Sequence, residues 1–255
     1  MPCAIIPVYN HGPTAGAVVG SLAVRNLPVI LVDDASNAET KAALARIVSE
    51  TESCFLYTLP VNLGKGGAVS HGLRKAFESG FTHALQIDAD GQHDLGQVDA
   101  FMKYAQLSPG TLVGGMPQYD DSVPKARLIG RGITNFWVMV ETLSRDIPDA
   151  MCGFRVYPLA ACNRLLTTKR LRRRMEFDIE FLVRLHWRGV RMKFIPVKVI
   201  YPEGGISHFR MFQDNIAISL MHTQLFFGMI LRLPILLARK IKKCFVREAG
   251  HVALV

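Results

Sequence analysis

Short apolar runs rich in β-branched residues alternate with helical patterns through the first half of the chain. The runs cover residues 4–9, 28–33, 54–59 and 83–88. The segments between them, at about 14–25, 38–50 and 67–80, space their apolar residues as helices do. This alternation predicts an α/β fold built on a doubly wound, mostly parallel sheet with a nucleotide-binding first half.

Polar side chains gather where the predicted strands end. They are Tyr9, Asn10, Asp33, Asp34, Asn62, Asp88 and Asp90. In open α/β sheets, ligands bind in the crevice beyond the carboxyl ends of the strands. We therefore expect the binding site at this edge.

The second half has a less regular pattern. Strand-like runs occur near 111–114 and 190–200, and helical patterns at about 127–143 and 177–187. Residues 216–238 are strongly apolar, but His222, Gln224, Arg232 and Pro234 interrupt them. We expect a catalytic domain over 1–212 and an apolar, basic, membrane-associating helix over 213–245. That helix could lie in the membrane interface, dock on the core or span the bilayer.

Composition and charge narrow the class of protein. The chain has 255 residues, of which 49% are apolar and 20% charged, so it has material for one packed domain and is not disordered. Its net charge is +9, with basic clusters at 170–174 and 239–243. These clusters predict anionic partners such as nucleotide phosphates or phospholipid head groups, or they form solvated helical faces. Neither cluster interleaves with aromatic residues, so we expect no nucleic-acid partner.

Cysteine usage and the first residues indicate the compartment. The five cysteines are scattered without a C-x-x-C pair, which favours a reducing environment. Pro7 and Asn10 interrupt the first apolar run too early for a signal peptide. We expect a cytoplasmic protein that is peripheral at the inner face of the cell membrane.

Asp88 and Asp90 flank one alanine directly after an apolar strand. Two carboxylates on such a turn can face one hard cation, and Mg²⁺ or Mn²⁺ commonly combines such ligands with substrate phosphates. Gln92 could add a neutral oxygen. Alternatively, Asp90 and Gly91 form a structural turn and Asp94 caps the next helix.

A glycine-rich turn, Asn-Leu-Gly-Lys-Gly-Gly-Ala at 62–68, opens a predicted helix. Its backbone amides could hold an anion, although it matches neither a P-loop nor a dinucleotide fingerprint. It could also be a purely structural turn. The acidic pair at 33–34 could accept hydrogen bonds from a ribose or base, or cap a helix.

Four motifs together resemble the inverting glycosyltransferase family 2. They are Ile-Pro-Val-Tyr-Asn at 6–10, Val-Asp-Asp-Ala-Ser at 32–36, the turn at 62–68, and Asp-Ala-Asp-Gly-Gln-His at 88–93. The resemblance is closest to the polyprenol-phosphate glycosyltransferase branch, typified by dolichol-phosphate mannose synthase. It implies a GT-A fold, a nucleotide-diphosphate sugar donor, and a metal held by Asp88, Asp90 and Gln92.

The resemblance also implies roles for individual residues. Pro7, Tyr9 and Asp34 match positions that contact the nucleoside, and Asn10 and Lys65 lie in the matching motifs as further substrate-binding candidates. Basic positions that meet donor or acceptor phosphates correspond to Arg127 and Arg131. His208 lies in the segment 204–210, where relatives carry a mobile acceptor loop.

Candidate bases come from two acidic segments. Asp149 opens a stretch that looks like the Asp-Pro-x-Ser-Gly-Phe segment of the family. Asp178, with Glu176 and Glu180, looks like its acidic helix start, or balances a helix dipole. With Asp90, we take Asp149 and Asp178 as the candidate catalytic residues. The chain departs from the family pattern at His11, Ala35 and Cys152. These differences leave the metal-binding carboxylates intact, so they affect the expected identity of the acceptor more than the expected activity.

The predicted reaction is a single displacement that inverts the anomeric carbon. The acceptor is lipid-linked or a glycan; a lipid phosphate is already ionised, whereas a hydroxyl needs a base. A sugar nucleotidyltransferase is an alternative, but no glycine-rich stretch follows the first predicted strand. A catalytically inactive membrane-associated nucleotide-binding protein is another, which the intact Asp88 and Asp90 pair disfavours.

Overall fold

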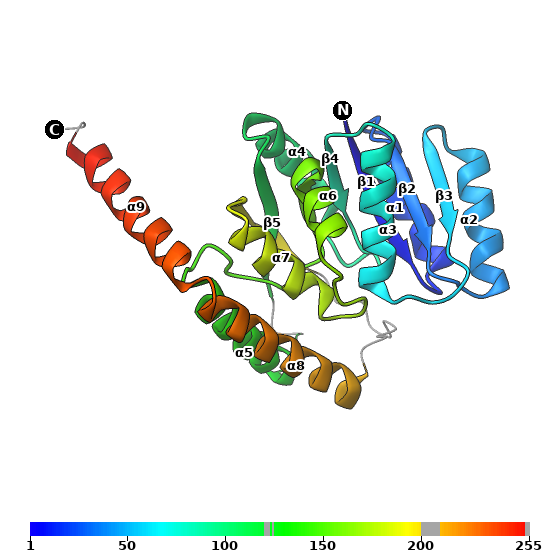
Figure 1. The fold of residues 1–255 in the computed structure, drawn as a ribbon. Helices are drawn as coiled ribbons and strands as arrows, with labels where there is room; N and C mark the ends of the chain where they lie inside the picture. Colours follow the sequence, from blue (N-terminus) through cyan, green and yellow to red (C-terminus); the bar gives the residue numbers. More distant parts are fainter. Residues whose placement is uncertain (120–122, 124, 200–209, 253–255) are drawn as a thin grey trace.

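One seven-stranded sheet forms the centre of the molecule (Figure 1). The computed structural model describes residues 1–119, 123, 125–199 and 210–252. The strand order is β3-β2-β1-β4-β6-β5-β7. The strands are β1 (Pro2–Val8), β2 (Val29–Asp33), β3 (Cys54–Thr58), β4 (His83–Gln86), β5 (Thr111–Gln118), β6 (Arg155–Pro158) and β7 (Arg191–Lys198).

The sheet is mostly parallel, as predicted. Its first four strands in the chain pair in parallel, and so do β5 and β7. Among the described strands, only β6 runs against its neighbours, between β4 and β5. Because β6 has four residues that are all buried, it shows no alternation of apolar and polar positions, and the sequence pattern did not predict it.

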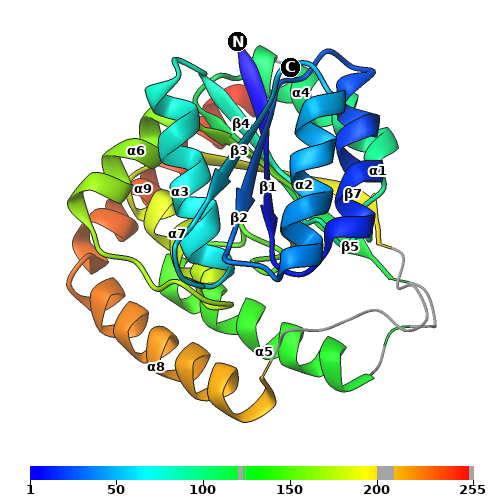
Figure 2. The same cartoon turned by 90° about the vertical axis from the view of Figure 1, so that its right-hand side faces the viewer.

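Helices cover both faces of the sheet. The helices are α1 (Gly12–Ala23), α2 (Ala38–Glu50), α3 (Lys65–Glu78), α4 (Val98–Leu107), α5 (Lys125–Thr142), α6 (Leu159–Thr168), α7 (Phe177–Trp187), α8 (Met211–Ile230) and α9 (Leu233–Val252). Figure 2 shows α1, α2 and α4 on one face, and α3, α6 and α7 on the other. Strand β1 contributes side chains to both faces of the sheet. Cys3 and Ile5 belong to one hydrophobic cluster, and Ala4, Ile6 and Val8 belong to the other.

The C-terminal helices combine a docked face with an exposed one. The apolar residues that α8 buries, Ile218, Met221, Leu225 and Met229, belong to the same cluster as the core of α7. Within the described residues no single helix meets the length and hydropathy needed to cross a bilayer. The segments Met211–Ile230 and Leu233–Lys242 meet that test only as a pair, bent by 72°.

The basic cluster at 170–174 lies in the loop between α6 and α7, so it is not a solvated helical face. Arg172 donates to Gln224 of α8 at 3.0 Å, and Arg174 pairs with Asp214 of α8 at 3.4 Å. Part of this positive charge therefore holds α8 against the loop that precedes α7.

Four cysteines are buried with free thiols: Cys3, Cys54, Cys152 and Cys162. Burial raises the pKa of Cys3 and Cys152 to about 12 and that of Cys54 to about 11. It also raises the pKa of Cys162. These thiols behave as small apolar groups of the core.

Candidate active site

The turns after β1 and β2 are tied together by Asn10. Its backbone N–H donates to the Ser36 hydroxyl at 3.1 Å, and its side-chain oxygen accepts from the Asn37 N–H at 2.9 Å. Asn10 and Ala35 both adopt left-handed backbone conformations, with φ of 56° and 58°. Pro7 pairs with Val32 in the sheet, and Tyr9 follows the end of β1, so both lie beside these turns.

The glycine-rich turn binds the carboxylate of Asp34. The N–H groups of Leu63 and Gly64 donate to its two oxygens at 2.6 and 2.8 Å. Burial raises the pKa of Asp34, although these two hydrogen bonds oppose the rise. The anion that this turn holds is thus part of the protein, and the turn fixes the loop after β2.

Close packing explains the glycines of this turn. Gly64 has a φ of 82°, and a side chain there would come within 2.8 Å of the Arg173 carbonyl oxygen. At Gly66 a Cβ would lie 2.2 Å from the Cβ of Phe177. The start of α3 therefore lies directly against the start of α7, which places Lys65 beside acidic residues far along the chain.

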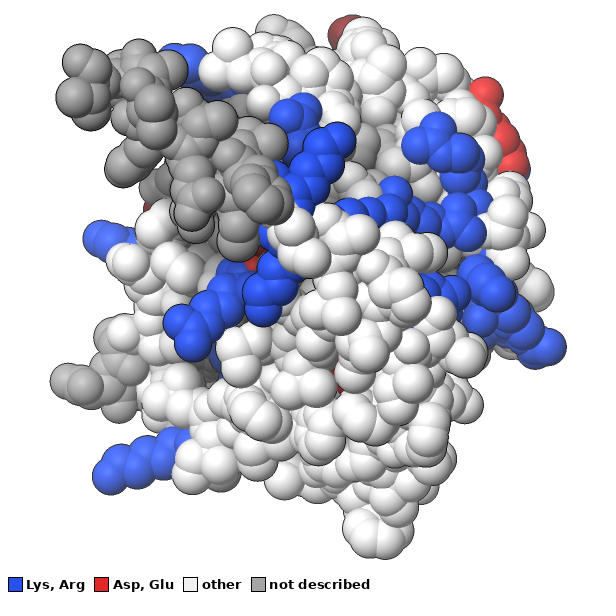
Figure 3. All heavy atoms as spheres, turned by 60° about the vertical axis from the view of Figure 1, so that its left-hand side comes forward, with Lys and Arg blue, Asp and Glu red and all other residues white. Residues whose placement is uncertain are grey.

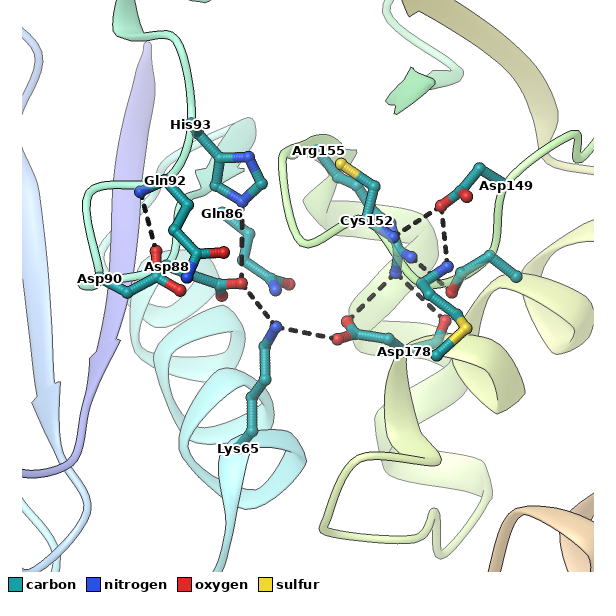
Figure 4. A network of polar contacts seen from close by, with 12 residues as sticks. Lys65, Gln86, Asp88, Asp90, Gln92, His93, Asp149, Cys152, Arg155 and Asp178 are labelled. Atoms are coloured by element: carbon teal, nitrogen blue, oxygen red, sulfur yellow. Dashed lines mark hydrogen bonds and ion pairs between the residues drawn. The ribbon is translucent and has the colours of Figure 1, made fainter. Parts of the chain in front are cut away.

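Lys65 bridges two carboxylates at the centre of the site (Figure 4). Its ammonium lies 2.8 Å from Oδ2 of Asp88, after β4, and 3.2 Å from Oδ2 of Asp178, on α7. Burial disfavours the charge on Lys65, but Asp178 and Asp88 outweigh it and raise its pKa. Burial likewise disfavours ionised Asp88, yet Lys65 and His93 hold the pKa of that carboxyl well below its usual range.

A buried polar network continues beneath this bridge. Arg155 is fully buried and donates to Asp178 Oδ1 at 3.2 Å and to the Ala150 carbonyl oxygen at 2.7 Å. It also donates to the Tyr157 hydroxyl, which in turn donates to Gln86. Sequence reasoning missed Arg155 and Gln86; both lie on short strands that pair with each other, and nothing local in the sequence marks them.

The metal-binding candidates line one pocket together with a cation from α5. The lining residues are Asp88, Asp90, Gln92, His93, Pro117, Tyr119, Arg131, Met151, Cys152, Gly153 and Val199. Oδ1 of Asp88 is buried and has no hydrogen-bond partner among the described residues. One oxygen of Asp90 accepts from the Gln92 N–H at 3.0 Å, which shapes the turn.

Gly153 and His93 position Asp88 from two sides. A Cβ at Gly153 would lie 2.5 Å from Asp88 Oδ2, so only glycine allows the loop after Asp149 to approach the carboxylate. His93 stacks on Phe154 at 5.4 Å, and its Nε2 lies 3.7 Å from Asp88 Oδ2. The sequence motifs contained both residues, but the pattern gave neither a role.

Arg131 points into the pocket and is supported by Asp149. The guanidinium donates to Asp149 Oδ2 at 2.7 Å and lies over the Tyr119 ring at 5.2 Å. The other oxygen of Asp149 accepts from the Met151 and Cys152 N–H groups at 3.0 and 2.7 Å. Asp149 therefore lies behind Arg131 and does not line the pocket.

Of the other candidates, Asp178 is buried, Arg127 is exposed and His208 is not described by the structure. Asp178 is enclosed between Lys65 and Arg155. Arg127 is exposed on α5, one turn before Arg131. His208 falls outside the described part of the chain.

The donor set fits a hard divalent cation that shares its ligands with a substrate. Asp88 and Asp90 offer carboxylate oxygens in one pocket, Gln92 offers an amide, and Asp88 Oδ1 is a buried acceptor without a described partner. No cluster of three or more His, Cys, Asp or Glu side chains in the described ranges could hold a metal by itself. Mg²⁺ and Mn²⁺ commonly complete such a two-carboxylate set with phosphate oxygens.

The family profile described as glycosyl transferase family 2 matches residues 3–166, which is more than half of the chain. The chain belongs to this family. The matched region carries the four sequence motifs, the pocket carboxylates and Arg131. Family membership favours the glycosyltransferase interpretation over a nucleotidyltransferase.

The names of two similar proteins support the expected branch. The UDP-N-acetylglucosamine–dolichyl-phosphate N-acetylglucosaminyltransferase of Methanococcus voltae is 27% identical, over 78% of this chain and 85% of the relative. The undecaprenyl-phosphate mannosyltransferase of Micrococcus luteus is 25% identical, over 80% of this chain and 85% of the relative. The resemblance to polyprenol-phosphate glycosyltransferases is thus confirmed.

Solved structures confirm the GT-A fold. The mannosyltransferase PcManGT from Pyrobaculum calidifontis, solved in complex with GDP-Man and Mn²⁺, superposes with a TM-score of 0.55 at 16% identity. The match covers 100% of this chain and 80% of that one. At this identity the likeness concerns the fold alone.

Proposed function

We propose that the chain is a divalent-metal-dependent, inverting glycosyltransferase that moves a sugar from a nucleotide-diphosphate sugar to a lipid phosphate at a membrane surface. One observation carries this proposal: the pocket brings Asp88 and Asp90 together with Arg131. Carboxylates for a cation and a guanidinium for a phosphate oxygen are the groups that the departing diphosphate and an anionic acceptor need. The names of the relatives support the choice of acceptor.

The residues around the pocket would bind different parts of the donor and acceptor. Asp88, Asp90 and the Gln92 amide would hold the cation, which when bound neutralises the departing diphosphate. Arg131 would bind a phosphate oxygen of donor or acceptor. Pro7, Tyr9 and Asp34, at the ends of β1 and β2, would lie against the nucleoside, with Asn10 shaping the turn beside them.

Asp149 and Asp178 would act by positioning other residues. An ionised acceptor phosphate needs no base, and the hydrogen bonds of Asp149 go to Arg131 and two backbone amides. Asp178 holds Lys65, which keeps Asp88 ionised. Asp149 would therefore fix Arg131, and Asp178 would fix Lys65.

Calorimetric titration tests the donor and metal sites together. UDP, GDP, CDP and dTDP would each be titrated with and without Mn²⁺ into the purified chain, Asp90→Ala and Asp94→Ala. Asp94 is the matched control because, among the described residues, its side chain accepts from the Gly96 N–H and so caps the short helix Leu95–Gln97. We expect one nucleotide to bind in a Mn²⁺-dependent way to the chain and the control, but not to Asp90→Ala. No nucleotide binding by the unchanged chain would refute the proposal and favour a protein that keeps the fold without the chemistry.

A further inference from the structure

Helix α5 exposes an apolar stripe that the catalytic site does not use. Ile129, Ile133 and Phe136 are 65%, 57% and 54% exposed. Their spacing of four and three residues places them on one side of the helix. Arg131 lies between them in the sequence and reaches the pocket, so one helix joins the exposed stripe to the site.

Helix α8 carries a second exposed stripe. Phe212, Ile216, Leu220 and Phe227 are all exposed, and each lies near the same side of the helix. Figures 1 and 2 show α5 and α8 side by side, below the carboxyl ends of β1 and β2. The Trp137 ring of α5 meets the Phe226 ring of α8 edge to face, at 6.1 Å between centroids.

The exposed charged side chains described on these helices are all basic. In α5, α8 and residues 233–242 the acidic residues are Glu141 and Asp214, and both are buried, paired with His222 and Arg174. The exposed charged side chains there are Lys125, Arg127, Arg239, Lys240 and Lys242. Figure 3 shows Lys and Arg beside a broad uncharged surface on this side of the molecule.

We propose that the two apolar stripes form one docking surface for a bilayer that contains anionic phospholipids. Apolar stripes flanked by basic residues are the pattern of helices that lie in the head-group region, where anionic lipids attract Lys and Arg. No described acidic side chain on these helices would be brought toward the lipid phosphates. The membrane contact therefore includes α5 of the catalytic domain and is not confined to the C-terminal segment.

If the proposed function holds, this docking surface would also explain how the acceptor reaches the pocket. Because Arg131 and the docking surface belong to the same helix, a docked α5 would hold the pocket close to the phosphate layer. A lipid phosphate would then reach Arg131 while its chain stayed in the bilayer. Membrane binding itself can be measured without turnover, so the two proposals fail separately.

The test is vesicle co-sedimentation of the full chain. Vesicles of phosphatidylcholine alone would be compared with vesicles that contain about 30% phosphatidylglycerol, at low and high salt. The variant Ile133→Glu/Phe136→Glu changes the docking surface. The matched control Val24→Glu/Leu107→Glu changes two exposed apolar residues that follow α1 and end α4, at the amino ends of β2 and β5.

We expect binding to the anionic vesicles to be at least about tenfold tighter than to neutral ones, and to weaken with salt. The docking-surface variant should lose about tenfold or more of this affinity, while the control keeps it. Equal affinity of the variant and the unchanged chain would overturn the proposal. The proposal would also be overturned if neither the unchanged chain nor the variant bound vesicles, and the unchanged chain instead self-associated in a way that the variant abolished.

Mn²⁺-dependent nucleotide binding, measured on the same proteins, separates folding from docking. A variant that binds nucleotide normally but not vesicles supports the docking surface. If no protein binds nucleotide but the chain and the control bind vesicles, the proposed function fails and the docking surface stands.

Discussion

The Asp88 carboxylate is packed so tightly against Gly153 that one methyl group should displace it. We expect Gly153→Ala to weaken Mn²⁺-dependent nucleotide binding at least about tenfold, because the new Cβ would lie 2.5 Å from Asp88 Oδ2. Overpacking should also cost about 1–3 kcal/mol in the free energy of unfolding. Calorimetry and urea unfolding measure the two effects.

Gly130→Ala is the control for this substitution. No heavy atom lies within 4 Å of a Cβ at Gly130, which is an exposed position within α5. It should bind nucleotide normally and gain about 0.5–1 kcal/mol in stability, since alanine favours a helix over glycine. Equal nucleotide binding by the two variants would show that Asp88 does not depend on the space at Gly153.

Asp149 offers a separate test of how the acceptor reacts. With a water-soluble short-chain prenyl phosphate as acceptor, we expect Asp149→Asn to raise the acceptor KM severalfold, because Arg131 loses its ion pair. The kcat should stay within about tenfold. A general base contributes roughly 10²–10⁴-fold. A fall in kcat of that size, with a changed pH profile, would instead make Asp149 the base.

At the scale of elements, a buried pair joins α5 to α8. Oε1 of Glu141 lies 2.7 Å from Nδ1 of His222, and both side chains are buried. Burial raises the pKa of Glu141, although His222 opposes the rise. With a folded-state pKa above the unfolded one, the carboxyl contributes full stability below the unfolded pKa and loses it as pH rises through the folded pKa.

Glu141→Gln removes this titration while keeping an oxygen for His222. As pH rises from about 4, below the ordinary pKa of a glutamate, to about 8, we expect the unchanged chain to lose more of its free energy of unfolding than Glu141→Gln does. Urea unfolding at several pH values measures this difference. Parallel stability curves for the two proteins would contradict the assignment of the pH dependence to Glu141.

The elements also show where sequence patterns carry information. The pattern placed α2 and α7 at their observed bounds, and the first four strands within two residues at either end. It gave no bounds for α4, although Asp94, the candidate cap of the next helix, does cap the short helix Leu95–Gln97 that leads into α4. It gave no prediction for β6 or α6. Strand β6 is too short for a period to appear, and α6 follows it without an intervening loop.

At the scale of the whole molecule, the pocket unites segments from distant parts of the chain. Local motifs predicted that Asp88, Asp90 and Gln92 share one site, and the structure places them around one pocket. Arg131 was expected to meet phosphate, and it lines the same pocket. The Lys65 bridge to Asp178 and the support from Arg155 could not be predicted, because packing of α3 against α7 creates them and no local pattern encodes that contact.

The four buried thiols give the molecule a practical property. A thiol reacts with alkylating dyes as its thiolate, and burial disfavours both ionisation and access at Cys3, Cys54, Cys152 and Cys162. In a background where Cys244 is replaced by serine, a single cysteine introduced at Ile129 would be the reactive position. The emission of a fluorophore there would depend on the polarity of its surroundings. Transfer of the α5 surface between water and lipid could therefore be followed in real time.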